Sequence, residues 1–192
     1  LACSVASAAS RTLVTASEVL QKARERGLQL DTVAQNSVIT AMGRGLHWPL
    51  AILSLEQALK ANLARVRSYR AAIAAVTSAG WPMALWLLSS MYEAGTPKPD
   101  LECFNEAMFA CVQSAPWEIC IGLLEVMKRH RCGPDLRAYA CAARACGLGQ
   151  AWQQALWLQE CTADPAGSLW NAVAWALQAA GRGLPPTPRS IT

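Results

Sequence analysis

A repeat of 35 residues constrains the fold of this chain more than any other feature of its sequence. Tyr69, Phe104 and Tyr139 stand 35 residues apart, and the last two each follow a Pro-Asp pair at the same interval. A fixed period of roughly 20–50 residues is typical of proteins that stack copies of one supersecondary unit. We therefore expect an array of such units and not a single globular core.

A tryptophan forms the second landmark of each unit. Trp81, Trp117 and Trp152 stand 12 or 13 residues after an anchor aromatic, and Trp48 holds this place in an earlier unit. The segments between these landmarks are rich in the helix formers Ala, Leu, Gln, Glu and Met, and Pro and Gly separate them. Strand-like alternation of Val, Ile and Thr is missing. The pattern predicts an all-α fold with two helices in each unit, the tryptophan opening the second.

The Pro-Asp pairs are expected to be the joints between units. Asp100 and Asp135 suit the position before a helix, where a carboxylate accepts hydrogen bonds from free N–H groups, and the prolines suit the extended residue before it. Residues 182–192 contain three prolines in four positions, which predicts an extended Pro-rich tail. The predicted units are 1–31, 32–65, 66–100, 101–135 and 136–166, with a half unit at 167–181.

Composition argues against several classes of site. The eight cysteines include no CxxC pair, and the only histidines are His47 and His130, so neither a metal nor another cofactor is expected. We expect most of the cysteines to be reduced thiols that pack as small apolar residues. No local catalytic signature occurs, so we expect neither an enzyme nor a small-molecule substrate. The net charge of +4 is mild for a nucleic-acid binder.

One uncharged segment is long enough to raise the question of a membrane span. Residues 71–92 carry no charge. Gly80-Trp81-Pro82 stands in the middle of the segment, and a Gly-x-Pro sequence favours a turn between two short helices. We therefore expect no membrane span.

The period, the paired helices, the Pro-Asp joints and the anchor aromatic together resemble the pentatricopeptide repeat (PPR) family over about residues 14–181. The segment ECFNEAMFACVQSAPWEICIGLLEVMKRHRCGPD is similar to the family motif nearly end to end, and AGWPMALWLLSSM and GQAWQQALWLQ resemble the start of its second helix. Tetratricopeptide repeats have a similar period but place the tryptophan in the first helix. The resemblance implies a right-handed solenoid of about five helical hairpins. In the family, the first helices line a groove that commonly holds single-stranded RNA.

The resemblance also implies which residues would read bases. In the family, the residue after the anchor aromatic and the residue that closes the repeat read one base together. Asn105 and Asp135 form a usual reading pair, and such a pair prefers uracil in the family. Asn105 is expected to face the groove. Asn36 would be partnered by Arg65, which is not usual, and Ala140 has no hydrogen-bonding side chain. The candidate reading residues are Asn36, Arg70, Asp100, Asn105, Asp135 and Asn171.

Arginines on the first helices have two interpretations. They are Arg67, Arg70, Arg137 and Arg144. A basic stripe along the groove would contact phosphates. Alternatively, these side chains form a solvated face with local pairs to Glu102 or Asp100. The family also tends to place an aliphatic residue at the position of the first helix where a base is sandwiched. In this chain that position holds Val33, Arg67, Glu102 and Arg137, of which only Val33 is aliphatic.

The last predicted helix suggests a protein partner. It carries several large apolar side chains and no second helix is expected after it, so part of this apolar area would be exposed and would mark a partner surface. The candidate partner surface consists of Trp170, Val173, Trp175 and Leu177.

We favour a non-enzymatic scaffold that binds proteins as an accessory subunit of a large organellar assembly, such as a photosynthetic or respiratory complex or a ribosome. The alternative is a single-stranded RNA-binding protein that acts in organellar RNA processing, stability or translation. Residues 1–17 are rich in Ser and Ala, with one Arg and no acid, and faintly resemble a transit peptide, although a helical repeat is the preferred interpretation of them. The expected location is a chloroplast or mitochondrion, for a nuclear-encoded protein whose leader has been removed or lies upstream.

Overall fold

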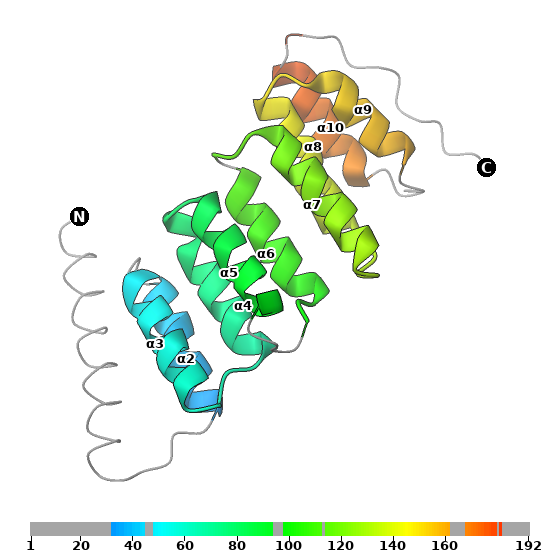
Figure 1. Cartoon of the computed structure of the whole chain (residues 1–192). Coiled ribbons are helices and arrows are strands. Elements are labelled where there is room, and N and C mark those ends of the chain that lie inside the picture. Colours follow the sequence, from blue (N-terminus) through cyan, green and yellow to red (C-terminus); the bar gives the residue numbers. More distant parts are fainter. Residues whose placement is uncertain are drawn as a thin grey trace, which may run out of the picture. The chain divides into compact units, whose positions relative to one another are not determined.

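The computed structural model describes residues 32–44, 48–93, 98–112, 114–161, 168–179 and 181 (Figure 1). Within these ranges the chain consists of helices and their connections, and no strand occurs, which confirms the all-α class. The predicted unit 1–31 and the predicted tail 182–192 lie outside the described residues.

First and second helices alternate along the described chain. Every second helix begins at the predicted tryptophan, and two of the first helices begin one residue after a Pro-Asp joint. The first helices are α2 (Thr32–Arg44), α4 (Val66–Ala75, followed by the 3-10 helix η1, Val76–Ser78), α6 (Leu101–Val112), α8 (Leu136–Leu148) and α10 (Ser168–Ala179). The second helices are α3 (Trp48–Lys60), α5 (Trp81–Glu93), α7 (Trp117–Arg129) and α9 (Trp152–Glu160).

The helices form two compact units, which divide between Pro99 and Asp100, at the first Pro-Asp joint. In the first unit, α2 packs against α3 and α4, and α4 also packs against α5. In the second unit, α8 lies at the centre and packs against α6, α7, α9 and α10. The finer division into repeat units of 35 residues stays a prediction.

The Pro-Asp joints cap the helices that follow them. The backbone N–H of Cys103 donates to Asp100 Oδ1 at 2.9 Å, and the N–H of Ala138 donates to Asp135 Oδ1 at 2.9 Å. The backbone of Asp135 is extended (φ −90°, ψ 176°), as expected of a residue that precedes a helix. Each aspartate therefore satisfies an N–H group that the helix itself leaves without a partner.

The anchor aromatics pack inside the protein. Tyr69 and Phe104 are fully buried, as are Met91 and Met127 on the second helices. Tyr139 is half-buried, and the Lys128 ammonium lies 6.0 Å from the centre of its ring. The repeating aromatic is thus a core residue in two of its three positions.

Neighbouring first helices approach closely at a glycine in both units. A Cβ atom at Gly43 on α2 would lie 2.6 Å from Ala75 Cβ on α4. A Cβ atom at Gly147 on α8 would lie 2.6 Å from Ala176 Cα on α10. In each pair the glycine lies near the end of its helix and meets an alanine of the next first helix. This shared contact places α10 against α8 as α4 lies against α2, so α10 is a helix of the first type.

The second-helix tryptophans lie at the ends of helices and are half-buried. The Trp117 indole packs closely against Gly149: a Cβ atom added to this glycine would lie only 2.5 Å from Trp117 Cδ1. Gly149 belongs to the turn between α8 and α9, so this indole packs against the next helical hairpin. Trp117 therefore fills space between its own helical hairpin and the next one.

The uncharged segment 71–92 is divided as predicted. It contains the end of α4, η1, a turn and most of α5, and Gly80 in the turn has a φ of +104°, which favours glycine. Among the described helices, none has both the length and the apolar character that crossing a membrane requires.

Candidate nucleic-acid interface

Asn105 and Asp135, the proposed reading pair, are in contact with each other. Asn105 Nδ2 donates to Asp135 Oδ2 at 3.1 Å, while the other carboxylate oxygen caps α8. Asn105 is only 3% exposed, and among the described residues its Oδ1 atom has no hydrogen-bond partner. The prediction that Asn105 faces an open groove is therefore wrong, because the carboxylate holds its amide inside the helix pair.

The predicted pair of Asn36 and Arg65 does not form. Asn36 Oδ1 accepts a hydrogen bond from Ser68 Oγ at 2.6 Å, and Ser68 Oγ accepts one from the Arg65 backbone N–H at 3.2 Å. The Arg65 guanidinium turns away and donates to the carbonyl oxygens of Asn62 and Ala64 at 3.3 and 3.0 Å. Ser68 is the residue that the sequence interpretation missed, although its place three residues after Arg65 fits a capping box.

The remaining proposed pairs are not tested by the structure. Arg70 is half-buried on α4, whereas Asp100 belongs to the other compact unit, so their pairing stays a prediction. Residue 166, which closes the predicted unit that contains Ala140, lies outside the described residues.

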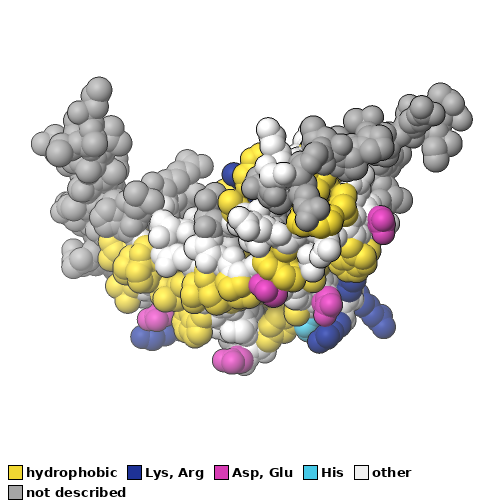
Figure 2. Space-filling model, turned by 90° about the horizontal axis from the view of Figure 1, so that it is seen from above, with side chains coloured by type: hydrophobic (Ala, Val, Ile, Leu, Met, Phe, Trp, Pro, Cys, Tyr) yellow, Lys and Arg dark blue, Asp and Glu magenta, His cyan; other side chains and the backbone are white. Residues whose placement is uncertain are grey.

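The arginines of the predicted basic stripe differ in their surroundings. Arg67 is exposed on α4. Arg137 Nη1 lies 3.5 Å from Glu102 Oε2, in an exposed ion pair of the kind that contributes little to stability. Arg137 therefore takes the local pairing that competed with phosphate contact. On the face shown in Figure 2, Lys and Arg side chains lie near Asp and Glu, and hydrophobic side chains cover much of the surface.

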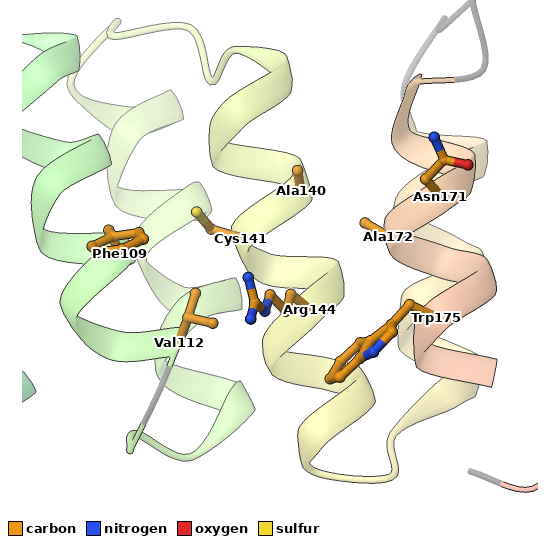
Figure 3. Close-up of a pocket in the computed structure, with 8 residues that line it drawn as sticks. All are labelled: Phe109, Val112, Ala140, Cys141, Arg144, Asn171, Ala172 and Trp175. Atoms are coloured by element: carbon orange, nitrogen blue, oxygen red, sulfur yellow. The ribbon is translucent and has the colours of Figure 1, made fainter. Parts of the chain in front are cut away.

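A cavity of about 510 Å³ opens between α6, α8 and α10 of the second unit. Its walls are mainly apolar, and its polar side chains are Arg144 and Asn171 (Figure 3). The Arg144 guanidinium lies 5.7 Å from the centre of the Trp175 ring, within the range of a cation–π contact. The lining residues are Phe109, Val112, Ala140, Cys141, Arg144, Asn171, Ala172 and Trp175.

Sequence reasoning predicted Asn171 and Arg144 as groove residues but missed Phe109, which lines the same cavity. A signal was available. Phe109 and Arg144 each stand five residues after an anchor aromatic, and Trp175 stands five residues after Trp170, the aromatic of the last first helix.

The predicted apolar partner surface on α10 needs correction. Val173 and Leu177 are buried, because α10 packs against both α8 and α9. Trp175 is 40% exposed and lines the cavity. The Trp170 side chain lies outside the described part of the chain. The prediction of a partner surface is therefore wrong for Val173 and Leu177.

The described cysteines are mostly buried thiols, as predicted. Burial raises the pKa of Cys146 to about 12. A hydrogen bond between the Cys111 and Cys120 thiols raises the pKa of Cys120 and lowers that of Cys111. Burial also raises the pKa of Cys141. In the described ranges, no three His, Cys, Asp or Glu residues are grouped so that they could hold a metal ion.

No protein-family model matches the chain, and no curated protein matches its sequence. Solved structures do match. The PPR protein PPR10, in complex with an 18-nucleotide psaJ RNA element, has a TM-score of 0.67 and 21% identity over 81% of this chain and 23% of that chain. The structure of PPR10 from maize has a TM-score of 0.60 and 17% identity, over 88% of this chain and 30% of that chain. This chain thus spans less than a third of PPR10.

A second match covers nearly the whole of both chains. The PPR domain of Arabidopsis thaliana protein-only RNase P 1, in complex with tRNA, has a TM-score of 0.67 and 13% identity over 93% of this chain and 97% of that chain. These likenesses agree with the alternation of first and second helices. The chain has the fold of pentatricopeptide repeat proteins.

Proposed function

We propose that this chain binds single-stranded RNA, and that in the second unit it does so through α6, α8 and α10. The observation that carries the proposal is the likeness of its fold, over most of the chain, to PPR structures solved with RNA bound. We propose a binding protein without catalytic activity, since the matched part of protein-only RNase P 1 is its PPR domain.

The chemistry of the cavity supports this proposal. Single strands are commonly bound by stacking bases on aromatic side chains and by cationic groups near the backbone. Phe109 on α6 is 54% exposed and Trp175 on α10 is 40% exposed. Arg144 is also exposed and comes from α8, the helix between these two. A duplex would not present its bases to these groups, so we expect a preference for single strands.

Fluorescence anisotropy with labelled oligonucleotides tests the proposal. We expect the protein to bind a mixed-sequence single-stranded RNA at least about tenfold more tightly than the same sequence as a duplex. Because this site offers few cations, the logarithm of the affinity should fall with the logarithm of salt with a slope of about −1 to −2. Binding no stronger than that of an unrelated helical protein with the same net charge would contradict the proposal.

The family resemblance also bears on where the protein acts. We propose that it acts in organellar RNA processing, stability or translation, in a chloroplast or mitochondrion. Fluorescent tagging of the full-length protein tests the location, and a signal confined to the cytosol would overturn it.

A protein-binding scaffold is the second candidate, and one observation favours it. In the first unit, Ile52, Pro82, Met83 and Trp86 line an apolar cavity of about 420 Å³ on α3 and α5, and Trp86 is 52% exposed. Exposed apolar area of this kind marks protein contacts. Size fractionation of native extracts with and without nuclease separates the two functions. Association with a large complex that survives nuclease, and is lost in Trp86→Ser, supports the scaffold, whereas loss on nuclease treatment supports RNA binding.

A further inference from the structure

Three side chains form a row along the cavity in the second unit. Phe109, Arg144 and Trp175 come from α6, α8 and α10 respectively, and Figure 3 shows them in this order across the view. Each stands four residues after the position that reads bases in the family, so each lies one helical turn further along the same face. The row thus lies beside the reading positions.

One reading position next to this row leaves space. Ala140 on α8 contributes only a methyl group to the cavity wall, whereas the reading position on α10 is the polar Asn171. The volume of about 510 Å³ falls in the range of small-ligand sites. By contrast, the Asn105–Asp135 pair is closed by its own hydrogen bond. The site open to a ligand is therefore the cavity beside Ala140, where the family's usual reading chemistry is missing.

Arg144 supplies the recognition chemistry in this cavity. Its guanidinium lies 5.7 Å from the Trp175 ring centre, which orients the planar fork of N–H donors. Among the residues that the structure describes, no carboxylate lies within ion-pair distance of Arg144. Its donors therefore remain available to an acceptor that enters the cavity.

The donors of an arginine fork match one base in particular. Guanine presents two acceptors, O6 and N7, on one edge, and arginine binds both at once. Uracil presents O4 as a single acceptor on this edge, so the fork can bind it only once. Adenine presents an N6–H₂ donor beside its N7 acceptor, and cytosine presents an N4–H₂ donor. An arginine has no acceptor for these groups. The exposed faces of Phe109 and Trp175 add stacking surfaces for the base.

We propose that the cavity lined by Phe109, Arg144 and Trp175 binds one guanine of a single-stranded RNA, stacked on an exposed aromatic side chain and held by the Arg144 fork. This inference rests on the proposed RNA binding and adds the base and the residues that select it. In the family, the residue after the anchor aromatic and the residue that closes the repeat select the base. The proposed site differs, because the side chain that selects the base lies one turn further along the first helix.

The test uses four labelled single-stranded RNAs that differ only in one central base, in an otherwise uridine sequence. Affinities are measured by anisotropy for the full chain and for Arg144→Lys, which keeps the positive charge but loses the planar fork. Arg129→Lys is the matched control, since Arg129 is also exposed but lies on the second helix α7 beside Glu125. Both substitutions are at exposed side chains, and circular dichroism confirms that the variants fold.

We expect the wild type and Arg129→Lys to bind the guanine-containing RNA about tenfold more tightly than the other three. Arg144→Lys should bind all four RNAs within about twofold of one another and keep the salt dependence of the wild type. Equal wild-type affinity for the four RNAs, or a guanine preference that survives in Arg144→Lys, overturns the guanine site but leaves RNA binding intact. Failure to bind any of the four overturns the proposed function and this inference with it.

Discussion

At the residue scale, Asp135 has two roles in the second unit. One carboxylate oxygen accepts from the first turn of α8, and the other accepts from the buried amide of Asn105. Asn105 already has one buried atom, Oδ1, without a hydrogen-bond partner among the described residues. The Asp135 carboxylate thus supplies the one hydrogen bond described for the Asn105 side chain. Loss of this carboxylate would affect both the start of α8 and the buried amide.

Asp135→Ala should therefore destabilise the protein more than Asp100→Ala. Loss of a cap costs about 1 kcal/mol. In Asp135→Ala the buried Asn105 amide also loses its acceptor, which adds about 1–3 kcal/mol. Urea unfolding followed by circular dichroism measures both variants. Equal losses of stability in the two variants would contradict the second role.

Cys146 provides a pH prediction at the same scale. Its pKa rises from an ordinary value of 9.0 to about 12 in the fold, so between these values the unfolded chain binds fewer protons than the folded one. The stability contribution is fully present below pH 9 and is lost as the pH rises toward 12, at about 1.4 kcal/mol per pH unit. Unfolding free energies at pH 8 and pH 10 should differ less in Cys146→Ala than in the wild type. An unchanged difference would contradict this assignment.

At the element scale, the contact between successive first helices depends on a residue without a side chain. Gly147 lies against Ala176 Cα, and a backbone atom of a packed helix cannot move aside as a flexible side chain can. A methyl group here must separate α8 from α10. The same helix pair forms the cavity wall that carries Arg144 and Trp175, so the close approach also supports the proposed site.

Gly147→Ala should lower stability by about 1–3 kcal/mol, because overpacking outweighs the better helix propensity of alanine. Gly122 on α7 is the matched control, since a Cβ atom there has nothing within 4 Å. Gly122→Ala should raise stability by up to about 1 kcal/mol. The shift of the urea midpoint measures both. A stabilised Gly147→Ala variant would show that the two helices are not in close contact.

At the scale of the whole molecule, the sequence predicts the elements better than the contacts between them. Helix starts at Trp117 and Leu136 were predictable because caps and turn residues act within a few positions. The partner of Asn36 was missed because Ser68 enters from the next first helix, 32 residues away. Burial of Val173 was missed because coverage by α8 and α9 depends on how three helices pack, which the spacing of residues does not express.

Cross-linking by ultraviolet light tests the central claim, that single-stranded RNA binds along α6, α8 and α10, most directly. A complex with single-stranded RNA is irradiated and digested, and the cross-linked residues are located by mass spectrometry. We predict cross-links at groups that line the cavity, namely Phe109, Cys141 and Trp175. Trp157 on α9 is the internal control, since it is 49% exposed but lies on a second helix. Cross-links at Trp157 with none at the cavity residues would contradict the claim.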